Sequence, residues 1–141
     1  MESAKKAGLK FEQLVRIMDT LRSDTGCPWD KEQDEKSIAN YFLEEVYEAL
    51  EAIFTGDSQS LGEELGDVLM EIVFLARIFK EKEKFSISDV LDGINQKMIR
   101  RHPHVFGQKR VKCSERVLDE WNKQKKEEKD RESVLDGIVK Y

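Results

Sequence analysis

Apolar residues recur at intervals of three and four along most of the chain, the spacing that places side chains on one face of an α-helix. No segment shows the alternation of apolar and polar residues that is typical of a strand, and no internal repeat is found. The pattern predicts five helices, at about residues 9–22, 37–54, 58–82, 86–101 and 114–130. We therefore expect an all-α fold, an antiparallel helical bundle of about five helices without a sheet.

Residues that cap or interrupt helices predict the segments between and outside these five helices. Ser37 is the predicted N-cap of the second helix. Residues 23–36 contain glycine, proline and many polar side chains, and they predict a loop of the length that is often functional. Residues 1–8 and 131–141 are expected to be loose tails.

Length and charge narrow the class of protein. A chain of 141 residues is expected to form a single domain, residues 1–141. Its net charge of −5 argues against binding of a nucleic-acid polymer through its phosphates. No apolar run approaches the roughly 20 residues that span a bilayer, and two cysteines make no disulfide framework. These features predict a cytoplasmic protein that does not bind membranes.

Two neighbouring predicted helices carry pairs of carboxylates. Glu45 and Glu48 lie on the helix over residues 37–54, and Glu64 and Asp67 lie on the next helix. Side chains three residues apart project about 60° apart, so each pair shares one helix face. Because only a short turn joins the two helices, they are expected to pack antiparallel and can bring the pairs together.

Such carboxylates most often form a solvated helix face, and the helix over residues 37–54 fits that interpretation. The helix over residues 58–82 differs, because Met70, Phe74 and Ile78 continue its carboxylate face in apolar residues. A helix that is apolar nearly all round is buried on both sides. We therefore expect this face to be covered by another subunit or by more of this chain, and a homodimer or higher homo-oligomer is predicted.

Four converging carboxylates need a cation. Two carboxylates 4 Å apart repel by about 1 kcal/mol in water, and by more where water is partly excluded. All the candidate ligand atoms are hard oxygens with no His or Cys nearby in the sequence, so Mg²⁺ or Mn²⁺ fits and zinc does not. Water and substrate phosphates usually complete the coordination of such ions, which indicates phosphoryl chemistry.

Several short strings, spread over nearly the whole chain, are similar to one known family. They are GCPWD at 26–30, EEVYE at 44–48, ELGD at 64–67, KMIRRHPHVFG at 97–107 and SVLDGI at 133–138. The chain resembles the MazG-type nucleotide pyrophosphohydrolases, whose signature is EExxE followed by ExxD. The carboxylate motif is shared with the wider group of all-α nucleoside triphosphate pyrophosphatases, and the string at 97–107 favours the MazG branch.

The resemblance implies a Mg²⁺-dependent hydrolysis of nucleoside triphosphates between the α and β phosphates, with a nucleoside monophosphate and pyrophosphate as products. Such an activity suits the removal of noncanonical nucleotides or the control of nucleotide pools. The implied metal ligands are Glu45, Glu48, Glu64 and Asp67, with Mn²⁺ as a substitute ion. Glu44, which completes the motif, points about 100° away from Glu45. It is assigned to supporting the ligands or orienting water. The candidate catalytic residues are therefore Glu44, Glu45, Glu48, Glu64 and Asp67.

Basic residues later in the chain are the implied phosphate ligands. The resemblance assigns Lys97 and Arg101 to phosphate, with Arg100 as a third candidate contact. Lys97 and Arg101 are four residues apart and share a helix face, which supports the assignment independently. Trp121 is a further candidate substrate-binding residue, either stacking on a base or sealing the edge of the site.

Two features leave other interpretations open. His102 and His104 have no companion ligands at metal spacing, and along an expected extended segment they are interpreted as structural. The alternative function is a non-catalytic helical interaction module whose acidic face binds a basic partner. That alternative leaves the paired carboxylates and the placement of Lys97 and Arg101 unexplained.

Overall fold

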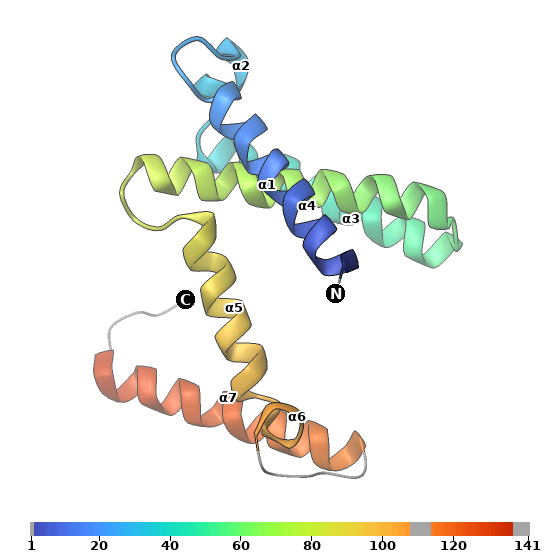
Figure 1. Cartoon of the computed structure of the whole chain (residues 1–141), viewed down its shortest axis with the longest axis vertical. Helices are drawn as coiled ribbons and strands as arrows, with labels where there is room; N and C mark the ends of the chain where they lie inside the picture. The colour runs from blue at the N-terminus through green and yellow to red at the C-terminus, as the bar shows by residue number, and fades with distance from the viewer. Residues whose placement is uncertain (1, 108–113, 137–141) are drawn as a thin grey trace. The chain divides into compact units, whose positions relative to one another are not determined.

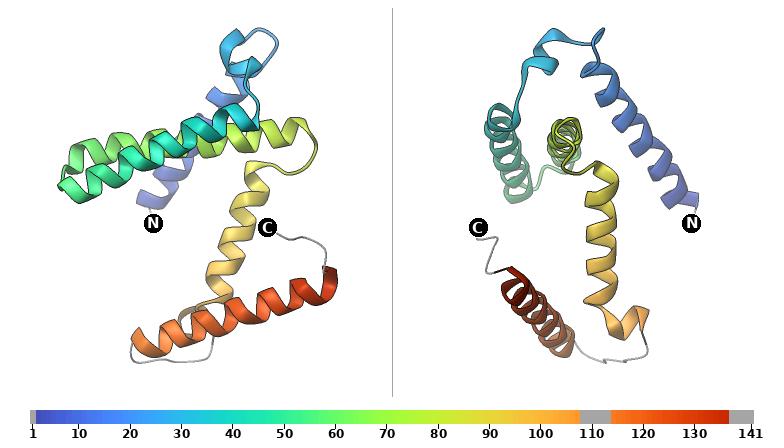
Figure 2. Two further views of the ribbon diagram at one scale, coloured as in Figure 1. Left: turned by 180° about the vertical axis from the view of Figure 1, so that it is seen from behind. Right: turned by 90° about the vertical axis from the view of Figure 1, so that its left-hand side faces the viewer.

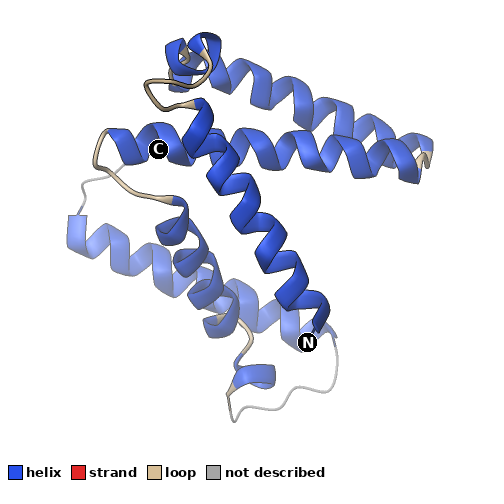
Figure 3. Ribbon diagram, turned by 45° about the horizontal axis from the view of Figure 1, so that its top comes forward, coloured by secondary structure: helices blue, strands red, loops and turns tan. Residues whose placement is uncertain are grey.

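The computed structural model describes residues 2–107 and 114–136, and every regular element in these ranges is a helix (Figures 1 and 3). The helices are α1 (Glu2–Leu21), α2 (Pro28–Glu32), α3 (Glu35–Thr55), α4 (Ser58–Glu81), α5 (Ile87–Arg100), α6 (Pro103–Phe106) and α7 (Ser114–Asp136). The all-α prediction is confirmed. Contacts divide the chain into two compact units, residues 1–88 and 89–141. The single domain expected from the length stays a prediction.

Helices α3 and α4 form an antiparallel pair that lies side by side along its length (Figures 1 and 2). Gly56 ends α3 in the left-handed conformation, with φ of 75°, which glycine adopts without strain. The Asp57 side chain then accepts a hydrogen bond from the Ser60 backbone N–H and caps α4. The two-residue turn explains why the carboxylates of both helices can face one another.

The predicted N-cap of α3 was wrong. Asp34 caps this helix, accepting a hydrogen bond from the backbone N–H of Ser37 at 2.8 Å. Ser37 is instead the third helical residue, and its hydroxyl accepts a hydrogen bond from the Asp34 backbone N–H at 3.0 Å. Together the two residues form a capping box that satisfies two helix-end donors, which a serine cap alone would not do.

The core of the first unit lies where α1 crosses α4 (Figure 1). Its buried apolar side chains are Met18, Ile38, Val73, Phe74 and Ile78. Phe74 and Ile78 are therefore covered by this chain itself, one of the two alternatives that the sequence left open. By contrast, Leu65, Leu69 and Met70, nearer the start of α4, are exposed.

Helices extend further than the hydrophobic pattern predicted. Residues 2–8, expected to be a loose tail, belong to α1, and α7 continues to Asp136 although the predicted helix ends at residue 130. Residues 2–8 are rich in Ala, Lys and Glu, which favour helix without an apolar stripe. Residue 1 and residues 137–141 lie outside the described ranges.

One arginine fixes the predicted loop over residues 23–36, which contains the short helix α2. Arg22 is 7% exposed and forms a bidentate pair with Glu81 of α4, at 2.9 and 2.7 Å. Its remaining nitrogen donates to the backbone oxygens of Asp30, at 2.5 Å, and Gln33, at 2.9 Å. The guanidinium group also lies 5.5 Å from the Phe74 ring centre. Arg22 thus ties α2 to α4 by charge and by backbone hydrogen bonds.

The second unit holds most of α5 together with α6 and α7. His102 and His104 do not lie on an extended segment as expected, because residues 103–106 form the one-turn helix α6 after Pro103. Among the described helices, none combines the length and apolar character that crossing a membrane requires.

Candidate functional site

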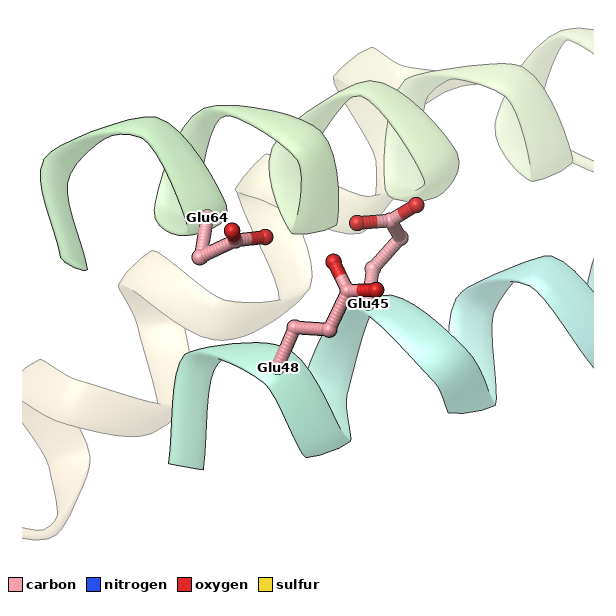
Figure 4. A group of neighbouring side chains, drawn as sticks. All are labelled: Glu45, Glu48 and Glu64. Atoms are coloured by element: carbon pink, nitrogen blue, oxygen red, sulfur yellow. The ribbon is translucent and has the colours of Figure 1, made fainter. Parts of the chain in front are cut away.

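Three glutamates from α3 and α4 converge on one point. Glu45 and Glu48 project from α3 toward Glu64 of α4, and their carboxylate groups face one another (Figure 4). One oxygen from each of the three lies within 4.8 Å of the others. The predicted pairing of carboxylates across the helix hairpin is therefore realised for three of the four residues.

Asp67, the fourth predicted ligand, lies outside this group of three but close to it. Its charge helps to raise the pKa of Glu45, Glu64 and Glu71. Asp67 is half-buried on α4, one turn beyond Glu64. Asp67 therefore adds negative charge to the site.

Among the described residues, no basic side chain forms an ion pair with Glu45, Glu48 or Glu64. One oxygen each of Glu45 and Glu64 is buried and has no hydrogen-bond partner there. Burial, followed by the charges of Asp67 and Glu48, raises the pKa of Glu45 above its usual value. The pKa of Glu64 is raised too, chiefly by the neighbouring carboxyl group of Glu48. Glu45 and Glu64 are half-buried and Glu48 is exposed. Converging carboxylates of like charge, with buried oxygens that lack a partner, are typical of a cation site.

Glu44 stands apart from these three. Its side chain is exposed on α3, and it contributes only the smallest of the effects that raise the pKa of Glu45. The direction predicted from the helix geometry agrees with this exposure, because adjacent residues point about 100° apart. Its assigned role in orienting water stays a prediction.

A cavity of about 440 Å³ adjoins the cluster on the side of the helix turn. It lies between α3 and α4 and is lined mainly by polar and acidic groups. The lining residues are Glu48, Glu51, Ala52, Thr55, Asp57, Ser60 and Glu64. Such a lining suits a hydrated cation with its phosphate ligands better than an apolar ligand.

Glu71 is a site residue to which the sequence analysis gave no role. It is 5% exposed on α4, and one of its oxygens has no hydrogen-bond partner among the described residues. Burial raises its pKa to about 7, with further contributions from the charges of Glu45, Asp67 and Asp30. The signal was present in the sequence, because Glu71 follows Glu64 by seven residues and so shares its helix face.

The donor set of the cluster consists of carboxylate oxygens. Oxygen-only ligation matches the hard divalent cations Mg²⁺ and Mn²⁺, whereas sites for softer metals include nitrogen or sulfur. The unpartnered buried oxygens of Glu45 and Glu64 give such an ion two ligand atoms that the protein itself leaves unsatisfied. The residues present therefore fit a hard divalent cation.

The candidate phosphate ligands lie in the second unit, around the end of α5. Arg101 stacks on Trp121 of α7, with 4.8 Å between its guanidinium carbon and the ring centre. Arg100 and Arg101 both pair with Glu128 of α7. Lys97 is half-buried one turn before Arg101. The structure thus gathers Arg100, Arg101 and Trp121, a grouping that spacing alone could not predict for Trp121.

The two histidines pack beside this group. The ring of His102 lies 5.1 Å from the Trp121 ring and 5.3 Å from the His104 ring, and its Nδ1 is 2.7 Å from the Met98 carbonyl oxygen. His104 is buried. These contacts agree with the structural interpretation of both residues and give no arrangement typical of a metal site.

A family model described as the MazG nucleotide pyrophosphohydrolase domain matches residues 33–106. The chain belongs to the MazG family. A nucleoside triphosphate pyrophosphohydrolase/pyrophosphatase MazG of Thermotoga maritima is 52% identical over 103 residues, which cover 73% of this chain and 40% of that protein. A nucleoside triphosphate pyrophosphohydrolase of Escherichia coli K12 is 44% identical over 133 residues, 92% of this chain and 51% of that protein.

These curated relatives are much longer, since the chain spans about half of their length or less. The fold is also found in a crystal structure of a mazG-related protein from Thermotoga maritima. That structure matches with a TM-score of 0.68 at 24% identity, covering 82% of this chain and 98% of the other. The family resemblance predicted from the strings over residues 26–138 is confirmed.

Proposed function

We propose that this MazG domain hydrolyses nucleoside triphosphates between the α and β phosphates, in the presence of Mg²⁺, to a nucleoside monophosphate and pyrophosphate. The observation that carries the proposal is the convergence of Glu45, Glu48 and Glu64 within 4.8 Å, with buried oxygens that no described group neutralises. The names of the relatives from Thermotoga maritima and Escherichia coli support the same activity.

The four motif carboxylates Glu45, Glu48, Glu64 and Asp67 would hold the ion, and Mn²⁺ would substitute for Mg²⁺. When bound, the ion would neutralise phosphate oxygens and increase the acidity of water in the site. The carboxylates orient a water molecule toward the α phosphorus, with Glu44 supporting them from the exposed side. As this water attacks, the bond from the α phosphorus to the bridging oxygen breaks and pyrophosphate leaves.

Lys97, Arg100 and Arg101 bind the triphosphate and offset negative charge that develops on the leaving pyrophosphate. Trp121, whose ring supports Arg101, contacts the nucleotide or closes the edge of the site. Because the proposed chemistry involves the phosphates, tolerance of different bases is expected. Removal of noncanonical nucleotides in the cytoplasm would be a suitable role.

We also propose that the domain acts as a homodimer or a higher homo-oligomer. Exposed apolar side chains follow successive turns of α3 and the start of α4, and exposed apolar surfaces often mark an interface between proteins. They are Leu43, Tyr47, Leu50, Phe54, Leu65 and Leu69. Sedimentation of the purified protein should give a mass of at least two chains, and a monomer across the micromolar range would contradict this proposal.

The activity is tested by product analysis. The protein is incubated with Mg²⁺ and a panel of ribonucleoside and deoxyribonucleoside triphosphates, and monophosphate with pyrophosphate is separated from diphosphate with phosphate. Glu48→Gln should reduce turnover by about a hundredfold or more, since it removes a ligand charge from the cluster. Glu63→Gln is the matched control, because Glu63 is exposed and adjoins Glu64.

Each outcome of this experiment has a clear meaning. Monophosphate and pyrophosphate from the wild type and the control, with loss in Glu48→Gln, would support the proposal. Diphosphate and phosphate would contradict the proposed cleavage position. Absence of any turnover would favour the alternative of an acidic interaction module.

A further inference from the structure

The two arginines at the end of α5 share a single carboxylate from α7. One oxygen of Glu128 accepts a hydrogen bond from Arg100 Nε, at 2.6 Å, and the other accepts from Arg101 Nη2, also at 2.6 Å. The side chains of Glu128 and Arg101 are only 14% and 11% exposed. A carboxylate bridging two guanidinium groups leaves one net positive charge, so the group still attracts an anion.

The planar guanidinium group of Arg101 is contacted both on its flat face, by an aromatic ring, and at its N–H edge, by Glu128. Its guanidinium group lies over the ring of Trp121, which precedes Glu128 on α7 by seven residues and therefore shares its helix face. One face of α7 thus holds Arg101 by a ring and by a carboxylate. The Nε atom of Arg101 is buried and has no hydrogen-bond partner among the described residues, so the described residues do not satisfy every donor of this arginine.

The pKa of Glu128 is lowered, first by its hydrogen bond with Arg101 and also by Arg100. Glu128 is therefore charged at neutral pH, and it holds its two partners before any ligand arrives. An arginine side chain is flexible, and binding of phosphate normally costs it much of that freedom. A side chain fixed in advance loses less freedom on binding, which increases affinity.

We propose that Glu128 is a positioning residue that orients Arg101 for the triphosphate of the substrate. The proposal rests on the proposed function, in which Arg101 binds phosphate, and it adds a residue outside the motifs that carry that function. Glu128 acts through Arg101 and makes no contact with the nucleotide itself. Arg101 keeps its charge when Glu128 is replaced, so the substitution should weaken binding of the triphosphate while it leaves the chemical step largely intact.

The first test compares Glu128→Gln with Glu127→Gln, its exposed neighbour on α7. At saturating Mg²⁺, Glu128→Gln should raise the KM for a nucleoside triphosphate about five- to tenfold with kcat within about twofold. The control variant should match the wild type. A lower KM in Glu128→Gln would show that Glu128 competes with phosphate for the arginines, and it would overturn the proposal, as would values equal to those of the control.

The second test separates positioning from a merely structural role. In an Arg101→Ala background, Glu128→Gln should change the KM by less than about twofold, because its effect passes through Arg101. An undiminished effect of Glu128→Gln in that background would overturn the proposal. If Glu128→Gln fails to fold, Glu128→Asp keeps the charge on a side chain one methylene shorter, and it should show a smaller rise of the KM. A KM unchanged in Glu128→Asp would then contradict the positioning role.

A binding measurement distinguishes this inference from the proposed function. Inorganic tripolyphosphate is titrated into the wild type, Arg101→Ala, Glu127→Gln and Glu128→Gln, and the heat of binding is followed without any hydrolysis. Weaker binding in Arg101→Ala but not in Glu128→Gln would refute only the positioning role. Unchanged binding in Arg101→Ala would refute the phosphate role of Arg101 and this inference with it. Weaker binding in both, with an unaffected control, would support the inference even if no nucleotide is hydrolysed.

Discussion

Helix α4 carries carboxylates in two opposite electrostatic situations. Near its C-terminal end, Glu81 accepts hydrogen bonds from Arg22 and Arg77, and its pKa is lowered, chiefly by Arg22. Nearer its N-terminus, Glu64 and Glu71 each have a buried oxygen without a partner among the described residues, and their pKa values are raised. One helix therefore holds a compensated and an uncompensated group of negative charges.

The compensated charges on α4 stabilise the fold, whereas the uncompensated charges suit the binding of a ligand. Arg22 and Glu81 link α1, α2 and α4, and both charges are satisfied by the protein alone. In the cluster around Glu45 and Glu64, the neighbouring carboxyl groups repel one another and raise the pKa of both residues. Unpaired buried charge costs stability and persists where the site serves a ligand. The comparison predicts that substitutions in the two groups change stability in opposite directions.

Arg22→Met should have the largest effect on stability. The substitution keeps an apolar stem but leaves Glu81 and the α2 carbonyl oxygens without their buried donor, so the free energy of unfolding should fall by about 3 kcal/mol. Urea denaturation of the metal-free protein measures this change. Arg22→Lys keeps the charge without the forked geometry and should recover only part of the loss. A loss below about 1 kcal/mol in Arg22→Met would show that this pair does not hold the unit together.

Glu71→Gln should act in the opposite direction and only at higher pH. In the folded chain the pKa of Glu71 is about 7, above its ordinary value of 4.5. Between these two values the folded protein keeps a proton that the unfolded chain has lost, so stability declines as pH rises and the contribution is gone above pH 7. Glutamine does not titrate. At pH 8 the free energy of unfolding of the variant should therefore be higher than that of the wild type by on the order of 2 kcal/mol.

At pH 4 the two proteins should be nearly equal, because Glu71 is then protonated in both states. Chemical denaturation at the two pH values, in EDTA, measures the difference. Glu63→Gln, at an exposed position of the same helix, should show no such pH dependence. A wild type that is as stable as Glu71→Gln at pH 8 would mean that Glu71 is satisfied there by another group.

Binding of Mg²⁺ should stabilise the uncompensated cluster. A ligand at ten times its dissociation constant adds about 1.4 kcal/mol to the free energy of unfolding when it binds only the folded state. Thermal unfolding with Mg²⁺ and with EDTA should show this gain in the wild type and in Glu63→Gln. Glu64→Gln, which lacks a ligand charge, should lose it. The same melting temperature with and without Mg²⁺ in all three proteins would contradict a metal site in the free enzyme.

Much of the acidic site could be predicted from the sequence because it depends on local geometry. The spacing of Glu45 and Glu48 puts them on one helix face, and the short turn at Gly56 brings Glu64 opposite them. Both facts follow from helix periodicity and a two-residue connection. The same periodicity placed Glu71 on this face. Its burial was missed because periodicity does not show which part of a helix face other elements cover.

Contacts between distant residues could not be predicted in this way. Arg22 meets Glu81 across 59 positions, and its other partners are backbone oxygens, which have no signature in a sequence. Likewise, Arg101 stacks on Trp121 and pairs with Glu128 only because α7 returns to the end of α5. Such pairs depend on tertiary packing, and each residue alone is an ordinary charged or aromatic side chain.

The smallest effect is expected for a charge pair without burial. Arg16 and Glu12 of α1 pair at 3.1 Å with side chains 76% and 55% exposed, whereas the Arg22 side chain is 5% exposed. Solvent screens such a pair, so Glu12→Gln should lower the free energy of unfolding by only about 0.3–0.5 kcal/mol, and by less at high salt. Urea denaturation at low and high ionic strength measures both values. If Glu12→Gln lowered the free energy of unfolding as much as Arg22→Met, burial would not be the reason why the Arg22–Glu81 pair stabilises the protein.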